Sequence, residues 1–256
     1  MQNRKSILTI SVSAIFLALI IVFSYIPNLG YITLGPISFT TIHIIVLIGA
    51  MIFGKWLGLV YGTFFGIFSL IISFQYPGTV NYLFINPFVS VLPRILFGFI
   101  SGCVFDFFRK HTDKANFLII SAPIAGILTI MHTFLTLICL YVFGYLDIFR
   151  ISQALGMSDI IEANEALFGS FGNFILVFIA PGSVCECAAA IILTPSISSL
   201  YAYHKLPTNF YKLGVVKEIG YGETIFSRKL DIILVALFSI VAIGLCALVL
   251  CLYYLM

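Results

Sequence analysis

Long apolar runs alternate with short polar breaks along the chain, and this pattern predicts membrane-spanning helices. A helix needs about 20 apolar residues to cross roughly 30 Å of hydrocarbon. The shortest run gains its missing residues from a lead-in that begins at Ile37. No ten-residue stretch alternates between apolar and polar positions, so membrane-spanning strands are not expected. We therefore expect seven helices, at residues 7–26, 40–53, 56–74, 88–108, 117–143, 171–197 and 231–256.

The composition indicates a protein that lies in lipid. Of its 256 residues, 61% are hydrophobic and 9% are charged, whereas a soluble domain carries about a quarter charged residues. The first apolar run is too long for the core of a signal peptide, and no small-residue cleavage site follows it before Pro27. The sequence thus predicts an all-α integral membrane protein whose first helix is retained.

Lysine and arginine residues gather on one side of the predicted topology. With the N-terminus inside, eleven of the 13 fall on inside segments, Arg150 falls outside and Arg94 lies within a helix. Such residues mark the cytoplasmic side of membrane proteins. The bias predicts a multi-pass protein of the plasma membrane with a cytoplasmic N-terminus and an outside C-terminus. The net charge of +3 gives no indication of nucleic-acid binding.

Small residues recur every four positions in two of the predicted helices. Glycines occupy every fourth position from Gly54 to Gly66, and Ala14 and Ala18 have the same spacing in the first helix. A ridge of small residues lets another helix backbone approach closely. That helix can belong to the same bundle or to a partner, and for the partner interpretation the docking residues would include Gly58 and Gly62.

Ionisable side chains within the apolar runs are candidate functional residues, because each costs about 2.5–3.5 kcal/mol at mid-membrane. Arg94 lies roughly 10 Å and Glu186 roughly 22 Å below the outer ends of their predicted helices, at 1.5 Å per residue. A direct ion pair then requires the last of these helices to start higher or to break at Pro181-Gly182. Arg94 is either part of such a pair or a planar donor for a substrate carboxylate. His43 is either a packing residue or a ligand contact, and the deeper His132 is expected to pack.

The outer segment at residues 73–88 reads SFQYPGTVNYLFINPF and combines aromatic rings with amides. Such a loop can close over a small polar ligand. It can also form an interfacial aromatic belt, with Asn86 capping a helix that starts at Pro87.

Catalytic and metal motifs are missing from the sequence. No phosphate-cradling glycine loop, Ser–His pair or zinc motif is present, and Cys185-x-Cys187 has the wrong spacing for a zinc knuckle. All six cysteines fall in apolar runs, where free cysteine behaves as a small hydrophobe. We expect neither an enzyme nor a metal or cofactor site in this chain.

Two segments of the sequence resemble a known protein family. They are GPISFTTIHIIVLIGAMIFGKWLGLVYGTFFGIFSLI and NPFVSVLPRILFGFISG, which contain Thr41 to Ala50, Gly54 to Gly66 and Leu92 to Gly98. They resemble the substrate-binding S-components of energy-coupling factor transporters, most closely the branch assigned to pantothenate. The likeness extends from residue 7 to about residue 200. It implies a vitamin-binding subunit that captures its ligand outside and topples in the membrane to deliver it inward.

The resemblance also implies partners and a site. Transport would need a membrane coupling subunit, on which the first helix docks through Ala14 and Ala18, and two ATPase subunits that use ATP. The vitamin would lie near the outer face, between the outer loops and the helices from residue 88 to residue 197. The expected ligand contacts are Thr41, His43, Tyr76, Asn81, Tyr82, Asn86, Arg94, Asn173 and Glu186.

Beyond the six helices of that family, the chain continues. Residues 1–200 form the expected S-component-like domain, 201–230 a basic cytoplasmic linker, and 231–256 an additional C-terminal helix. In the family's sixth helix an Asn often stands one turn before the acid, where this chain has Gly182.

Two other functions are compatible with the residues alone. A stand-alone secondary transporter of a small organic anion would contain inverted repeats and a broken helix, and Pro181-Gly182 is a candidate break. A membrane enzyme would require Glu186, His132 and His43 to converge.

Overall fold

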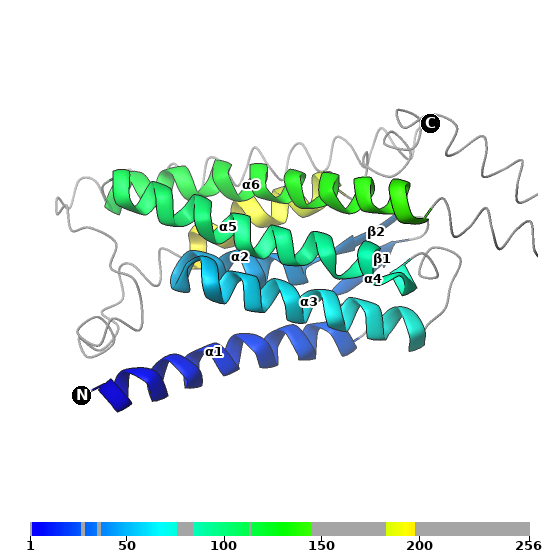
Figure 1. Ribbon diagram of the computed structural model, residues 1–256. Coiled ribbons are helices and arrows are strands. Elements are labelled where there is room, and N and C mark those ends of the chain that lie inside the picture. Colours follow the sequence, from blue (N-terminus) through cyan, green and yellow to red (C-terminus); the bar gives the residue numbers. More distant parts are fainter. Residues whose placement is uncertain are drawn as a thin grey trace, which may run out of the picture.

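The computed structural model describes residues 2–26, 29–34, 37–75, 84–112, 114–144 and 183–197. These form a bundle of helices with one short hairpin (Figure 1). The candidate residues Tyr76, Asn81, Tyr82 and Asn173 lie outside the described residues, as do the expected linker at 201–230 and the expected helix at 231–256. The elements in chain order are α1 (Gln2–Tyr25), β1 (Tyr31–Leu34), β2 (Ile37–Thr40), α2 (Ile42–Phe53), α3 (Lys55–Gln75), α4 (Pro87–Ser90), α5 (Leu92–His111), α6 (Lys114–Cys139), the π-helical turn η2 (Leu140–Gly144) and an unlabelled helix Ser183–Ile197, drawn in yellow.

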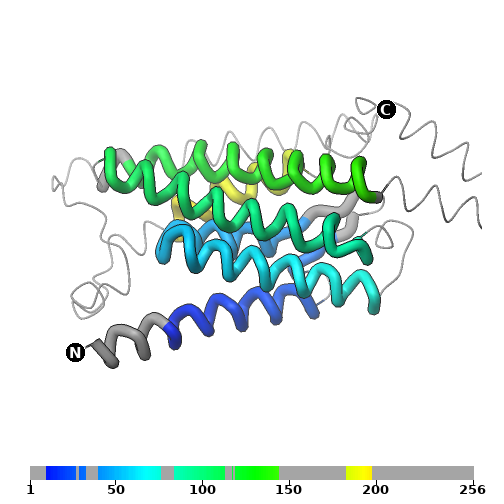
Figure 2. Tube along the Cα trace, in the orientation of Figure 1, coloured from blue at the N-terminus to red at the C-terminus, as the bar shows by residue number. Residues whose placement is uncertain are grey.

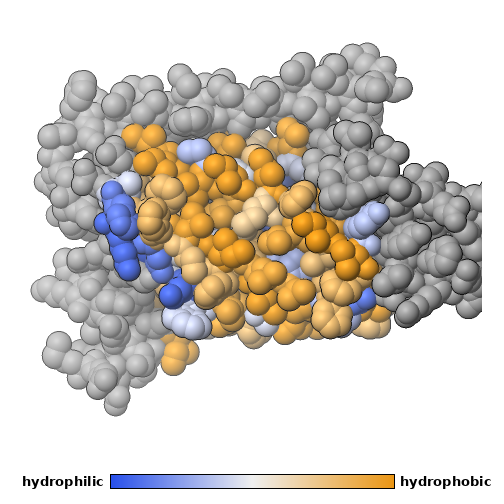
Figure 3. Space-filling view, turned by 45° about the horizontal axis from the view of Figure 1, so that its top comes forward, coloured by the Kyte–Doolittle hydropathy of each residue, from blue (hydrophilic) through white to orange (hydrophobic). Residues whose placement is uncertain are grey.

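The helical class predicted from the sequence is confirmed. Among the described residues, three helices are long and apolar enough to cross a membrane, namely Lys55–Gln75, Pro87–His111 and Ile119–Phe143. Shorter apolar helices cover Ile10–Tyr25, Ile42–Phe53 and Ser183–Ile197. Figure 3 shows the consequence, a broad hydrophobic flank with hydrophilic residues gathered toward one end of the described part.

One element was not anticipated from the pattern. β1 and β2 pair in antiparallel fashion, with Tyr31 opposite Thr40 and Leu34 opposite Ile37. Each strand has four residues, which is too short for the alternation that marks a membrane-spanning strand. The hairpin precedes α2, so that helix begins at Ile42 and has 12 residues.

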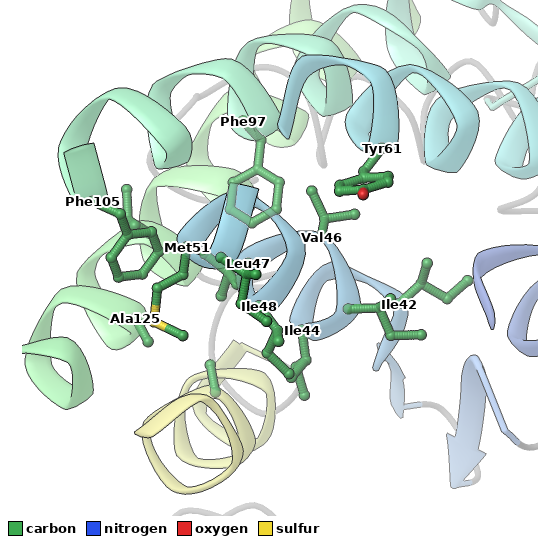
Figure 4. Close-up of a cluster of buried hydrophobic side chains, with 14 of the residues drawn as sticks. Ile42, Ile44, Val46, Leu47, Ile48, Met51, Tyr61, Phe97, Phe105 and Ala125 are labelled. Atoms are coloured by element: carbon green, nitrogen blue, oxygen red, sulfur yellow. The ribbon is translucent and has the colours of Figure 1, made fainter. Parts of the chain in front are cut away.

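α2 is the centre of the bundle. All 12 of its residues are buried, as expected for a helix that is apolar all round. Figure 4 shows Val46 near Tyr61, Met51 near Phe105, and the helix Ser183–Ile197 alongside α2. Because other helices surround it, α2 can be shorter than a full span and still avoid lipid.

α2 and α3 meet at a tight corner. Gly54 has φ of 86°, a left-handed conformation that glycine adopts without steric cost. Its N–H donates to the carbonyl of Ala50 (2.8 Å), and its carbonyl accepts from Gly58 N (3.0 Å). The interval between the helices expected at 40–53 and 56–74 is therefore this corner.

The glycine ridge of α3 packs against α5. A Cβ added at Gly58 would meet the carbonyl of Gly98, and one at Gly62 would meet the carbonyl of Arg94, both closer than 3.0 Å. The ridge therefore serves packing between helices of the same chain, which is the first of the two interpretations. This corrects the expectation that Gly58 and Gly62 face a coupling partner, because both are buried under α5.

α1 lies at the edge of the bundle, beside α3, as the tube in Figure 2 also shows. Ala14 and Ala18 are exposed on it. By contrast, three other residues of the same helix are buried against the bundle, namely Ser13, Ile20 and Ser24. The small-residue face of α1 therefore points away from the core.

Candidate functional site

Two histidines, an arginine and a glutamate are buried in the described bundle. Their exposed fractions are 0% for His43, 4% for Arg94, 3% for His132 and 8% for Glu186. They come from α2, α5, α6 and the helix Ser183–Ile197, respectively. Buried ionisable groups are costly in a membrane protein and mark candidate sites.

Arg94 lies in the first turn of α5, directly after Pro93. Its Nη1 donates to the carbonyl of Val89 (2.5 Å). Its guanidinium carbon lies 5.7 Å from the centre of the Phe65 ring and 5.1 Å from that of Phe84, within the range of cation–π attraction. Its Nε has no hydrogen-bond partner among the described residues. The guanidinium thus lies close to two aromatic rings and keeps a nitrogen that can still donate a hydrogen bond.

Glu186 forms hydrogen bonds with both the hairpin and α6. Its Oε1 accepts the backbone N–H of Thr40 (2.6 Å) and its Oε2 accepts the hydroxyl of Thr133 (3.4 Å). Arg94 and Glu186 act on each other electrostatically, but no ion pair joins them within the described ranges. Glu186 reaches the hairpin through Thr40, and Arg94 lies in the first turn of α5, so the two groups lie at a similar level, unlike the depths estimated from the predicted helix starts.

The two histidines form a stack. The ring centres of His43 and His132 are 5.8 Å apart, and the rings are inclined by 14°. His43 Nδ1 lies 3.3 Å from the hydroxyl of Thr40. His132 also packs on Phe97, with 4.6 Å between ring centres. His132 therefore packs as expected, yet neither of its nitrogens, nor Nε2 of His43, has a hydrogen-bond partner in the described part of the chain.

Two other candidates have local structural roles. The Thr41 hydroxyl donates to the carbonyl of Leu29 (2.5 Å) and its N–H donates to Gly30 O (2.9 Å), which fixes the start of α2. Asn86 caps α4, since its Oδ1 accepts the N–H of Phe88 (3.0 Å) just before Pro87. The capping alternative for Asn86 is thus confirmed.

Tyr31 adds a neutral hydroxyl to the region. It lies in the hairpin between two helices, and burial raises the pKa of its phenol above the ordinary value. The phenol therefore stays protonated at physiological pH, and Arg94 is close enough to act on it electrostatically.

Several residues of this region were missed from the sequence, and some had a signal. The buried positions of α3 are spaced three or four apart and include Gly62, Phe65 and Ser69, so Phe65 follows the glycine face. Thr40 and Thr133 had no such signal, because their role depends on Glu186, which is distant in sequence. Among the described residues, no three His, Cys, Asp or Glu side chains are placed to hold a metal ion.

Residues 8–198 match the family model of the ECF transporter substrate-specific component. The match covers most of the chain and includes every phrase on which the resemblance rested. The chain belongs to the family of ECF transporter substrate-specific components. It is a multi-pass membrane protein and the part of a transporter that selects a small-molecule substrate.

The chain is also similar to a named protein. Over 118 residues it is 34% identical to the pantothenate transporter PanT of Leuconostoc mesenteroides subsp. mesenteroides. The aligned region is 44% of this chain and 57% of that protein, so the match spans little more than half of the relative's length.

Proposed function

We propose that this substrate-specific component binds pantothenate at the outer face of the membrane, with Arg94 as the contact for its carboxylate. The observation that carries the proposal is the buried guanidinium, which lies close to two aromatic rings and whose Nε has no partner among the described residues. An arginine in such a setting donates to a carboxylate with little reorganisation. The similarity to a relative named as a pantothenate transporter supports the choice of ligand.

The proposal includes partners and an orientation. A membrane coupling subunit and two ATPases would drive transport, with ATP used by the ATPases. The exposed Ala14 and Ala18 on α1 support docking at the edge of the bundle. Lys55 begins α3, and Arg109, Lys110 and His111 end α5, so basic residues lie at the end of the bundle opposite the hairpin. This distribution supports a cytoplasmic N-terminus; a C-terminus outside would follow from the seventh helix expected at 231–256.

Binding of labelled pantothenate to the purified full chain tests the proposal. We expect saturable binding by the unaltered protein. Arg94→Ala should weaken it by roughly 10- to 100-fold, since a hydrogen bond to a charged group contributes about 1.5–3 kcal/mol. Arg94→Lys should recover only part of the affinity, because an ammonium lacks the planar fork.

The matched control is Lys110→Ala, which removes an exposed positive charge from the opposite end of α5 and should leave affinity unchanged. Two results would contradict the proposal. One is an unaltered protein that binds no pantothenate, and the other is an Arg94→Ala variant that is folded and binds as tightly as the original. Ion-gradient-driven uptake without any partner would instead favour a secondary transporter.

A further inference from the structure

The stacked rings of His43 and His132 carry buried nitrogen atoms to which the proposed contact between Arg94 and a carboxylate gives no role. His132 exposes 3% of its surface and His43 exposes none. Three of their four ring nitrogens have no hydrogen-bond partner among the described residues. A buried polar atom without a partner is costly, and native proteins rarely keep one without a use.

Packing alone does not explain a histidine at position 132. Its ring contacts Phe97 at 4.6 Å, Phe65 at 5.8 Å and His43 at 5.8 Å between ring centres. A phenylalanine would make the same ring contacts without burying two polar nitrogens. The nitrogens are therefore the property that distinguishes this residue from an ordinary core aromatic.

We infer that His132, stacked on His43, is a specificity-determining contact for uncharged hydroxyl groups of the ligand whose carboxylate Arg94 holds. The inference rests on the proposed function and deepens it. Two charged imidazolium rings at 5.8 Å would repel each other, so at least one ring of the stack is neutral. A neutral imidazole offers one donor and one acceptor, which complements a hydroxyl group in both respects.

The positions of the two contacts agree with one small ligand. Phe65 lies between them, because its ring contacts the Arg94 guanidinium at 5.7 Å and the His132 ring at 5.8 Å. The cation and the histidine stack thus share one aromatic neighbour. Pantothenate has a carboxylate at one end and two hydroxyls at the other, so it matches a cation followed by a neutral donor–acceptor pair.

Contacts with Thr40 fix the orientation of the His43 ring. Its Nδ1 meets the Thr40 hydroxyl, and the backbone of Thr40 is held by Glu186. With Nδ1 engaged in this way, Nε2 is the nitrogen that remains for a ligand. The stack is therefore set by contacts from β2 and the helix Ser183–Ile197, and His132 follows the plane of His43.

The test compares two ligands on two proteins. The first ligand is pantothenate, and the second is N-(3,3-dimethylbutanoyl)-β-alanine, which keeps the carboxylate and amide but lacks both hydroxyls. The original protein should prefer pantothenate by about 5- to 100-fold. His132→Phe keeps the ring contacts and should reduce this preference toward unity, mainly by weakening pantothenate binding. His111→Phe, the same substitution at an exposed position, should preserve the preference.

Each outcome decides between distinct conclusions. If the original protein binds neither ligand, the proposed function itself fails. If it binds pantothenate but His132→Phe keeps the full preference, the inference about His132 is overturned while the function stands. Should His132→Phe not fold, His132→Gln, which retains a donor and an acceptor, takes its place and is expected to keep part of the preference. Equal affinity of the original protein for both ligands overturns the inference without any variant.

Discussion

Glu186 connects groups that are far from it in the sequence. Its carboxylate accepts the backbone N–H of Thr40, 146 residues away, and the hydroxyl of Thr133. An N–H at the end of β2 needs an acceptor where water is excluded. Glu186 was expected to contact the ligand, and these two bonds give it a positioning role that acts through the hairpin and His43.

Two substitutions at Glu186 should separate its charge from its acceptor role. Glu186→Gln retains one side-chain oxygen for Thr40 and should keep most of the stability. Glu186→Ala leaves that N–H without its partner and should lower the free energy of unfolding by about 1–3 kcal/mol. Thermal unfolding of the purified variants in detergent measures both. If Ala and Gln were equally mild, the bond to Thr40 would not contribute as described.

At the residue scale, the sequence identified the costly groups better than their partners. Arg94, His43 and Glu186 were all recognisable as ionisable residues within apolar runs, and all are buried. Thr40 and Thr133 were not recognisable as their neighbours, because a hydroxyl is an ordinary side chain in an apolar segment. Their importance depends on which element lies opposite, and a single sequence does not contain that information.

The interface between α3 and α5 is a close backbone contact, and it also bears on the site. Gly58 and Gly62 of α3 face Gly98 and the backbone of Arg94 on α5. Farther along, Gly102 of α5 faces the backbone of Lys55. Glycines on both helices let the backbones touch, which sets the position of Arg94 relative to Phe65.

A pair of glycine substitutions should distinguish stability from binding. In Gly62→Ala and in Gly102→Ala the new Cβ lies closer than 3.0 Å to the backbone of the neighbouring helix. Overpacking of this kind costs about 1–3 kcal/mol, so both variants should unfold at lower temperature. Only Gly62→Ala displaces the backbone of Arg94, and only it should weaken pantothenate binding strongly.

Unfolding temperatures and binding isotherms on the same preparations check this prediction. Ile67→Ala, at a residue of α3 that is itself 39% exposed, is the control that should change neither quantity much. Equal loss of binding in Gly62→Ala and Gly102→Ala would show that the effect is general loosening of the bundle.

At the element scale, the hydrophobic runs predicted that helices are present, but they did not predict the short elements and breaks between them. Gly54 marks a helix boundary through its backbone chemistry, and that boundary lies between the helices predicted at 40–53 and 56–74. The helix predicted at 88–108 is instead divided at Val91 into α4 and α5. The hairpin between α1 and α2 had no comparable signal, because strands of four residues are shorter than the pattern that reveals them. α2 is short because other helices surround it, which is a property of the assembled bundle.

At the scale of the whole molecule, the proposed ligand contacts and the proposed docking residues lie in different parts of the described bundle. The hairpin lies at the end of the bundle at which α2 begins, whereas α1 lies along its edge (Figure 1). His43, on which His132 stacks, lies in the first turn of α2, and Arg94 lies in the first turn of α5. The described residues that contact Arg94 and the histidines do not include Ala14 or Ala18. Ligand binding and partner docking should therefore be separable by mutation.

A bulky substitution on α1 tests this separation. Ala14→Leu and Ala18→Leu add volume to exposed positions and should block close approach of a coupling subunit. We expect pantothenate binding by the isolated chain to be unchanged, while co-purification with the coupling subunit and ATPases, and uptake into cells, fall at least about tenfold. Ile15→Leu, at a neighbouring position that is 59% exposed, keeps side-chain volume and should preserve both. If the alanine variants co-purify normally and transport normally, docking uses another face; if they lose ligand binding as well, the two tasks are not separate in this fold.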